Sequence, residues 1–443
     1  MANLATEPQP AHGRSGGWGR IPLYVRIVAA MALGIVGGML LAGLAPAEQA
    51  HAIGHYLLDI GKLILRLLSM IAIPLIFVAI IHALLGANVD ARTAKRLLGL
   101  LLTNTLVAIC IGLVVVDILQ PGTHFSHLTP PQHTLPPVDM WEELKKKIPD
   151  SFVGSLVPNW QTGQQEVIPA VLIALGVGIA LRRVREKNKQ NGKNGVDSVA
   201  EFFETFYGVF LIALHWIIEL IPIAVFGIVT DVVATQGLSP FASLISFIGA
   251  VLVALFLQAC YYLLRVRLQS WVRPVQFLRG GAEALLTAFS AASSTAAAAL
   301  NYTCLREKIG LREESATMGA LVGSNFNNDG TALYEAMGPM YIAQALGQPI
   351  PVLRQPMVAF MAVIASVGAP GIPEAGLVTM VLVFNAVGLP TEYVALLLPV
   401  DWFLDRCRTM VNVMGDMSVA CVLDGKIPEQ REQAPGAPDR LRT

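Results

Sequence analysis

Charged residues are scarce in this sequence. Only 14% of its 443 residues are Asp, Glu, Lys or Arg, whereas 54% are hydrophobic. Soluble domains carry about 25% charged residues, so this composition excludes a soluble globular protein of this length. The mean hydropathy of +0.59 agrees with that conclusion. The chain is therefore predicted to be an integral membrane protein that crosses the bilayer several times.

Cysteine is also rare, and neither sign of charge is in excess. The five cysteines show no CxxC spacing, which excludes a disulfide framework and a thiolate metal site. The 31 basic residues equal the 31 acidic ones, so no basic surplus indicates a nucleic acid partner. The lipid bilayer is the partner that the composition predicts.

Long apolar runs fill the first part of the chain. They are predicted to cross the membrane at 22–44, 54–86, 94–119, 165–183, 201–235 and 239–268. Several exceed the ~20 residues that a crossing needs, which implies tilted helices. Lys and Arg gather in alternate loops, so the positive-inside rule places both termini in the cytoplasm. The Pro- and His-rich segment 120–160 is predicted to be an extracellular loop.

Beyond about Pro274, small and polar residues interrupt the apolar segments. One interrupted segment is 285–305, and the other is 352–389, which contains Pro-Gly-Ile-Pro. Irregular backbone at membrane depth is stable only where it is buried in protein or lines a wet cavity. Paired interruptions of this kind indicate the binding site of a transporter. Helix packing through Ser and Gly is an alternative that explains the first segment but not the second.

A third interruption lies between these two segments. Residues 323–331 read Gly-Ser-Asn-Phe-Asn-Asn-Asp-Gly-Thr. An unwound turn there would expose carbonyl oxygens beside the carboxylate of Asp329. Hard cations bind in such oxygen cages, so this stretch is a candidate cation site.

A polar stripe runs down the last apolar segment. Asp401, Asp405, Arg408, Asn412 and Asp416 are spaced by 4, 3, 4 and 4 residues. On a helix they fall within an arc of roughly 80°. Each Asp or Arg at the bilayer centre costs about 2.5–3.5 kcal/mol, so the stripe must face a protein interior with partners. It predicts a substrate and ion pathway, with a salt-bridged stripe that only fastens helices as the alternative.

Two of these motifs resemble a known family. The run Asp-Trp-Phe-Leu-Asp-Arg at 401–406 and the stretch 323–331 look like the last helix and the Asn-Met-Asp-Gly-Thr signature of the dicarboxylate/amino acid:cation symporters. The run at 401–406 is similar to that of the animal excitatory amino acid transporters in particular. The resemblance implies an all-α integral membrane protein of eight transmembrane helices and two re-entrant helical hairpins, working as an elevator-type transporter.

The sequence departs from the family at several positions. Asn328 stands where the family has Met, a side chain that closes the space between the sodium sites and the substrate. In the first hairpin, Ala292 and Ala299 replace a Ser and the Pro at the tip. Arg406 follows the animal arrangement, whereas archaeal relatives place that Arg at the position of Ala292.

The resemblance also implies a substrate pocket. Arg408 would bind the side-chain carboxylate of the substrate, and Asp405 would bind its amino group. The other implied substrate residues are Asn412, Thr409, Thr331, Ser293, Ser294, Ile372 and Gly376.

Three cation sites are implied in the same way, for sodium ions, protons or both, with no organic cofactor. The first consists of Asp416 with the backbone at Gly323, Asn327 and Asn412. The second consists of backbone carbonyls at Asn325, Ser366, Val367 and Ala369. The third consists of Asp329 and Asn327 with a ligand from the third span. There, Leu101 and Asn104 stand at the positions of the family's aromatic and hydroxyl ligands, so Thr105 is the remaining candidate ligand on that span.

Glu335 lies four residues beyond Thr331, on the same helix face. Desolvation disfavours a charged carboxylate inside the membrane, so Glu335 is a candidate proton carrier; a Glu that merely packs is the alternative. Animal members of the family have Glu in this context, where it takes up a proton with substrate and releases it before potassium-assisted return. The resemblance therefore implies proton coupling through Glu335, with potassium counter-transport as a further expectation.

The domain boundaries follow from the same comparison. Spans 1, 2, 4 and 5 are expected to form a scaffold that assembles a homotrimer, and the remainder is expected to move. The predicted parts are a cytoplasmic tail 1–21, scaffold 22–93, transport helix 94–119, extracellular loop 120–164, scaffold 165–238, transport domain 239–424 and cytoplasmic tail 425–443. The expected location is the plasma (inner) membrane.

The expected activity is import of aspartate or glutamate by cation symport, with no enzymatic step. A substrate of net charge −1 entering against ~100 mV is opposed by about 2.3 kcal/mol, so two co-transported positive charges are needed before the potential helps. A C4-dicarboxylate symporter would leave Asp405 without an amine to pair. A neutral amino acid exchanger would leave Arg408 unpaired. A ligand-gated anion channel or a sensor would bind the same ligand without concentrating it.

Overall fold

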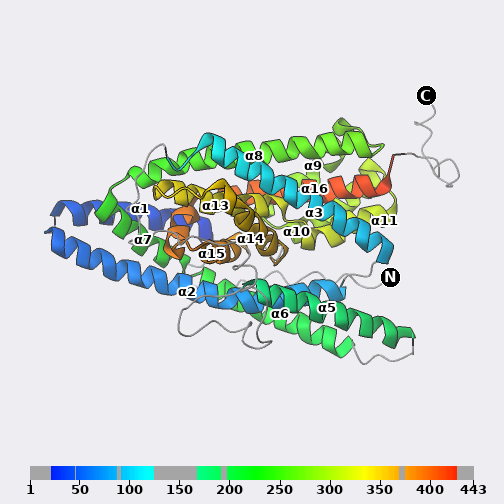
Figure 1. The fold of residues 1–443 in the computed structure, drawn as a ribbon, viewed down its shortest axis with the longest axis horizontal. Helices are drawn as coiled ribbons and strands as arrows, with labels where there is room; N and C mark the ends of the chain where they lie inside the picture. The colour runs from blue at the N-terminus through cyan, green and yellow to red at the C-terminus, as the bar shows by residue number, and fades with distance from the viewer. Residues whose placement is uncertain are drawn as a thin grey trace.

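Helices account for every regular element that the structure describes. The computed structural model describes residues 21–44, 46–86, 91–123, 167–190, 197–368 and 375–426. Within these ranges the secondary structure is helical, as the predicted all-α class requires. The long helices lie roughly along one common direction (Figure 1).

The first half of the chain forms long helices. These are α1 (Leu23–Leu44), α2 (Ala47–Gly86), α3 (Ala91–Leu119), α5 (Val167–Gln190), α6 (Asp197–Ile218), α7 (Ile221–Gln236) and α8 (Ser239–Gln269). Among the described residues, five stretches are long and apolar enough to cross a membrane: Val25–Leu44, Ala52–His82, Lys95–Leu119, Ser198–Thr235 and Leu244–Gln269.

One predicted span differs from the structure. The segment 201–235 forms two helices, because α6 ends at Ile218 and α7 begins at Ile221. Pro222 stands in the first turn of α7, where the missing N–H of proline costs nothing. The same proline cannot continue a helix from the preceding turn, so it accounts for the break.

The second half is built from shorter pieces. Its helices are α9 (Pro274–Ala291), α10 (Ser294–Thr303), α11 (Glu313–Ala316), α12 (Gly323–Phe326), α13 (Asp329–Ala345), α14 (Gln355–Gly368), α15 (Ala375–Val387) and α16 (Val394–Asp424). Two π-helical turns, at Cys304–Ile309 and Thr317–Val322, join some of them. The interruptions that the sequence predicts near residues 292 and 328 coincide with boundaries between these pieces, whereas the one near residue 370 lies outside the described residues.

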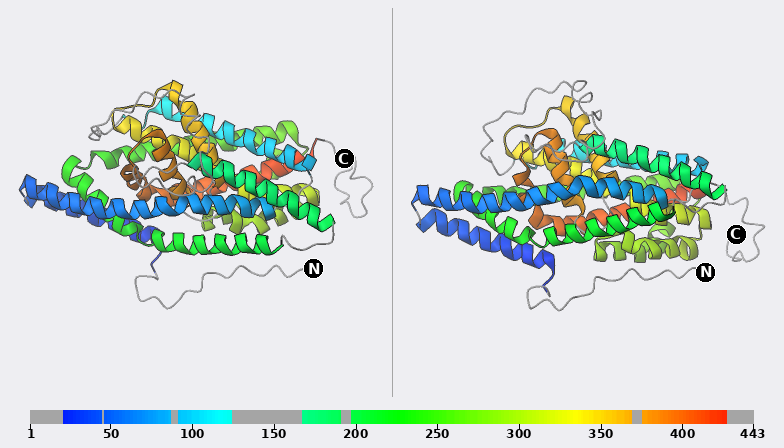
Figure 2. Two further views of the ribbon diagram at one scale, coloured as in Figure 1. Left: turned by 60° about the horizontal axis from the view of Figure 1, so that its bottom comes forward. Right: turned by 90° about the horizontal axis from the view of Figure 1, so that it is seen from below.

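The helices form two layers. Helix α2 packs against α5, α6 and α7, and α1 packs against α7. On the other side, α3 and α8 pack on α13 and α16, and α9 and α10 pack on α16. Figure 1 shows α2, α5 and α6 along one side of the bundle and α8 along the other, with α13 to α16 between them, and Figure 2 shows the same elements from two further sides.

Candidate substrate and cation site

The first hairpin turns at the small residues that the sequence singled out. Between α9 and α10, Ala292 adopts a left-handed backbone conformation with φ of 50°. Ser293 then caps α10, because its Oγ accepts a hydrogen bond of 3.1 Å from the N–H of Ala296. The Oγ of Ser294 donates to the carbonyl of Ser324 at 3.1 Å. The hairpin is thus fastened to α12, next to the interruption between α12 and α13.

The second hairpin consists of α14 and α15. Its turn, with Ala369 and Ile372, lies outside the described residues. Gly376, in the first turn of α15, lies directly against Arg408, because a Cβ there would come within 3.2 Å of both terminal guanidinium nitrogens. Any side chain at position 376 would therefore displace the guanidinium, so this hairpin covers Arg408 with bare backbone.

The polar stripe of α16 faces the protein interior. Asp401, Asp405, Arg408, Asn412 and Asp416 are all buried, and none is more than 7% exposed. Thr409, Thr331, Ser293 and Ser294 are buried as well. Because these residues come from α10, α13 and α16, the structure brings the predicted substrate residues that it describes to one region between the hairpins and α16.

Arg408 is fully buried and carries two carboxylate partners. Its Nη2 lies 3.0 Å from Oδ1 of Asp401 and 2.9 Å from Oδ1 of Asp405. Its Cζ lies 4.0 Å from the centre of the Tyr334 ring, a cation–π contact. Nε and Nη1 have no hydrogen-bond partner among the described residues. A buried guanidinium with donors to spare is suited to bind a carboxylate.

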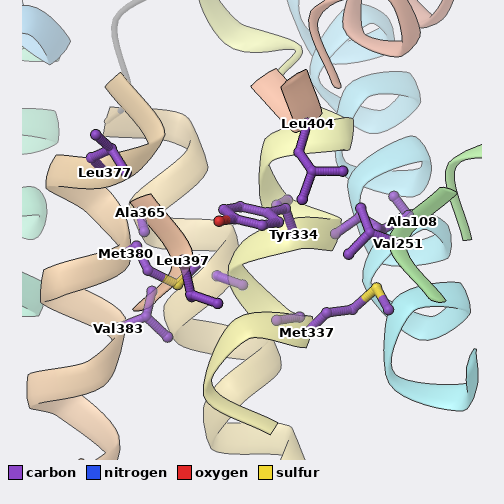
Figure 3. Close-up of a cluster of buried hydrophobic side chains, with 14 of the residues drawn as sticks. Ala108, Val251, Tyr334, Met337, Ala365, Leu377, Met380, Val383, Leu397 and Leu404 are labelled. Carbon is purple, nitrogen blue, oxygen red and sulfur yellow. The ribbon is translucent and has the colours of Figure 1, made fainter. Parts of the chain in front are cut away.

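The ring of Tyr334 lies against this guanidinium. Figure 3 shows its ring among Ala365 and Leu377 of the second hairpin, Leu404 of α16, and Ala108 and Val251 of α3 and α8. Apart from the guanidinium of Arg408, the labelled residues around the ring are apolar, and Tyr334 is completely buried. Asp401 belongs to the predicted polar stripe, whereas Tyr334 was not predicted, because the ring that faces Arg408 comes from another helix.

Asn412 connects α16 to the broken helix. Its Oδ1 accepts the N–H of Gly330 at 2.7 Å, and its Nδ2 donates to Oγ1 of Thr331 at 3.4 Å and to Oδ1 of Asn328 at 3.4 Å. Its backbone carbonyl accepts a 3.1 Å hydrogen bond from Nδ2 of Asn327. Gly330 allows this approach, because a Cβ there would come within 2.7 Å of the carbonyl oxygen of Arg408.

Asp416 fits a cation. It is completely buried, and neither carboxylate oxygen accepts a hydrogen bond within the described ranges. Gly323 lies against it, since a Cβ there would come within 2.8 Å of Oδ1. The Oδ1 of Asn327 is another buried oxygen without a partner in the described part of the chain. Buried charge requires compensation, so unpaired oxygens of this kind suit a small hard cation.

Asp329 has partners that the sequence predicted only in part. Its Oδ1 accepts a 2.7 Å hydrogen bond from Thr105, the residue left by the alignment of the third span. Its Oδ2 accepts a 2.5 Å hydrogen bond from the hydroxyl of Tyr262 on α8. Asn104, at the expected position of a ligand, instead accepts a hydrogen bond from the buried Arg265. Leu101 packs in a separate apolar cluster.

The sequence motifs did not indicate Tyr262, because the family's aromatic ligand aligns with Leu101 on α3. No local pattern in α8 distinguishes Tyr262 from the adjacent Tyr261. The difference is burial: Tyr262 is completely buried, while Tyr261 is partly exposed and lies near Arg265. The structure therefore places a buried aromatic hydroxyl from the neighbouring helix α8 beside Asp329.

We expect Tyr262→Phe to weaken cation binding at Asp329. The substitution removes a hydrogen bond to a buried carboxylate, which contributes about 1.5–3 kcal/mol, or roughly a 10- to 150-fold change in affinity. Sodium titrations of substrate binding in detergent would measure it. Tyr261→Phe is the matched control, since it removes a hydroxyl one residue away, and an equal effect in both variants would refute the assignment.

Glu335 is completely buried on α13. Neither of its carboxyl oxygens makes a well-aligned hydrogen bond to the residues in the described ranges. It lies close enough to Thr379 and Arg408 for both to act on it electrostatically. Glu335 thus lies next to the pocket rather than on the outer surface of α13.

The remaining predicted cation ligands lie at the ends of helices. Asn325 belongs to α12, and Ser366 and Val367 belong to the last turn of α14. The carbonyl of Ser366 accepts a 3.1 Å hydrogen bond from Nδ2 of Asn328. No cluster of three or more His, Cys, Asp or Glu occurs in the described part of the chain, so any cation there depends on carbonyl and amide oxygens as well as carboxylates.

A buried cluster of charged side chains between broken helices, inside an apolar helical bundle, defines the class of this protein as a membrane transporter. The model of the Sodium:dicarboxylate symporter family matches residues 23–426. The chain belongs to this family, as the motifs at 323–331 and 401–406 predicted.

Several proteins similar to this chain are named excitatory amino acid transporters. The chain is 28% identical to excitatory amino acid transporter 3 of Mus musculus, over 93% of this chain and 86% of that protein. It is 31% identical to an excitatory amino acid transporter of Caenorhabditis elegans, over 89% of this chain and 85% of that protein. It is 30% identical to excitatory amino acid transporter 5 of Homo sapiens, over 82% of this chain and 75% of that protein.

Proposed function

We propose that this protein imports acidic amino acids, aspartate or glutamate, by cation symport. The observation that carries the proposal is the buried Arg408, whose Nε and Nη1 have no hydrogen-bond partner among the described residues. An acidic amino acid offers a side-chain carboxylate to this guanidinium and an amino group to Asp405. Asn412, Thr409, Thr331, Ser293, Ser294, Ile372 and Gly376 complete the proposed pocket, and the names of the similar transporters support this substrate class.

Cations would enter at carboxylates that are not engaged by Arg408. Asp416, with Asn327 and the backbone at Gly323 and Asn412, is one proposed site. Asp329, with Thr105 and Tyr262, is another. Two monovalent cations at these sites carry the net charge of a monoanionic substrate from −1 to +1, so the membrane potential then assists import by about 2.3 kcal/mol per 100 mV.

The two layers suggest how the site reaches both sides of the membrane. We assign 22–93 and 165–238 to a fixed scaffold, and 94–119 and 239–424 to a moving domain. Substrate and cations are held almost entirely by the second group, so they can be carried as cargo while the hairpins open and close. Eight spans, an elevator movement and cytoplasmic termini are parts of this proposal.

Uptake into proteoliposomes tests the proposed function. Labelled aspartate and glutamate are offered with sodium and pH gradients imposed independently, and an accumulation above equilibrium is expected with an inward cation gradient. Equilibration without accumulation would indicate a channel or a sensor. Uptake of succinate in preference to both amino acids would indicate a C4-dicarboxylate symporter.

We also expect the protein to be a homotrimer held by scaffold helices. Large apolar side chains such as Leu33, Leu40, Tyr56, Ile60 and Leu63 are exposed on α1 and α2 of a single chain, which leaves scaffold surface for neighbouring subunits and lipid. Cross-linking and native mass analysis in mild detergent measure the oligomer. Monomer alone at all detergent concentrations would contradict this expectation.

A further inference from the structure

Asn328 occupies the junction of the substrate pocket and the second hairpin. It is buried between α12 and α13. Its Nδ2 donates to the carbonyl of Ser366 at 3.1 Å, and its Oδ1 accepts from Nδ2 of Asn412 at 3.4 Å. The family has Met at this position, and a thioether cannot make the first of these bonds, because it has no donor.

The orientation of the Asn328 amide follows from an unambiguous donor. The backbone N–H of Gly330 can only donate, and it lies 2.7 Å from the Asn412 side chain, so the Asn412 atom facing it must be Oδ1. Nδ2 of Asn412 consequently faces Asn328. The Asn328 atom facing it must then be Oδ1, which leaves its NH2 group directed at the carbonyl of Ser366.

This orientation disfavours a cation on the Ser366 carbonyl, because the hydrogen bond from Asn328 occupies one of the two lone pairs of that oxygen. A sodium ion there needs lone pairs from the surrounding oxygens, whereas an amide NH2 group presents positive hydrogens to the same place. Turning the Asn328 amide over would offer its oxygen to the ion. The turn would, however, set two NH2 groups against each other and break two buried hydrogen bonds.

We propose that the Asn328 amide takes the place of a cation at the carbonyl of Ser366, in the last turn of α14. The hydrogen bond to Ser366 joins α13 to the last turn of α14, so the second hairpin is tied to the pocket by the protein itself. The inference rests on the proposed function, since it concerns the number of cations bound with substrate. Binding of substrate would require one cation fewer than in a protein with Met at this position.

Sodium titration of substrate binding tests this inference. Aspartate affinity of the purified protein is measured by calorimetry across sodium concentrations at fixed ionic strength and pH. The slope of log affinity against log sodium concentration reports the number of sodium ions bound with the substrate. We expect Asn328→Met to raise this slope by about one relative to the unsubstituted protein, because it frees the Ser366 carbonyl and removes the NH2 group.

Two further variants keep the result interpretable. Asn328→Leu keeps the branching at Cγ and the number of side-chain heavy atoms but removes the polar group, and it should also raise the slope. Gln344→Met removes a buried amide from the far end of α13. There, Oε1 of Gln344 accepts a hydrogen bond from the N–H of Gly122, and its Nε2 donates to the carbonyl of Val116 on α3. Its slope should equal that of the unsubstituted protein, even if its thermal stability falls.

The outcomes separate this inference from the proposed function. Aspartate binding with equal slopes in the unsubstituted protein and both Asn328 variants would overturn the role of Asn328 while leaving acidic amino acid binding intact. Absence of aspartate and glutamate binding in the folded unsubstituted protein would instead overturn the proposed function. A rise in slope in the Gln344→Met control would show that lost packing, not the amide at 328, changes the ion dependence.

Discussion

Arg408→Cys abolishes uptake of aspartate and glutamate and opens the pocket to neutral amino acids. The guanidinium is the buried cation facing the pocket, held by Asp401 and Asp405 and stacked on Tyr334. Removing one member of a buried, hydrogen-bonded charge pair costs about 2–5 kcal/mol, which corresponds to an affinity loss of about 30- to 5,000-fold. Competition binding with aspartate, glutamate, serine and alanine measures both effects.

Controls separate lost charge from lost packing. Arg408→Lys keeps the positive charge but loses the planar fork, so we expect weaker binding of acidic substrates without a switch to neutral ones. Met410→Cys introduces a thiol on the same helix at a partly exposed position outside the pocket, and it should retain normal selectivity. Unchanged aspartate affinity in Arg408→Cys would refute the assignment of the substrate carboxylate.

Helical periodicity predicted much of this fold. The stripe of five polar residues on α16 lies inside the protein, because a charged residue in an apolar helix has few stable alternatives. Interruptions by small and polar residues predicted the breaks between α9 and α10 and between α12 and α13. The division of 201–235 was not predicted, since hydropathy alone does not register the effect of Pro222 on the preceding turn.

Contacts between distant helices could not be predicted in this way. The pairing of Asp329 with Tyr262 depends on how α8 is placed against α13. The hydrogen bond from Asn328 to Ser366 joins residues 38 positions apart. A sequence motif identifies which residues are polar, whereas the packing decides which of them meet.

Glu335→Gln is expected to keep exchange of external for internal substrate while losing net uptake and its pH dependence. Glu335 is completely buried beside the pocket, and an unpaired charge at this depth is costly. A carboxyl group can pick up a proton when the loaded carrier moves and release it afterwards, whereas a Gln amide stays neutral throughout. The loaded carrier therefore still crosses, and the return of the empty carrier is impaired.

The two transport modes in proteoliposomes distinguish this role from simple packing. Exchange of labelled for unlabelled aspartate at equal concentrations should remain within about twofold of the unsubstituted protein, while net uptake should fall at least about tenfold, a barrier increase of about 1.4 kcal/mol. Glu335→Asp, which keeps a titratable carboxyl group, should retain pH-dependent net uptake. If Glu335→Gln shows full net uptake with unaltered pH dependence, Glu335 only packs, because a group that cannot exchange a proton cannot couple proton movement to the return step.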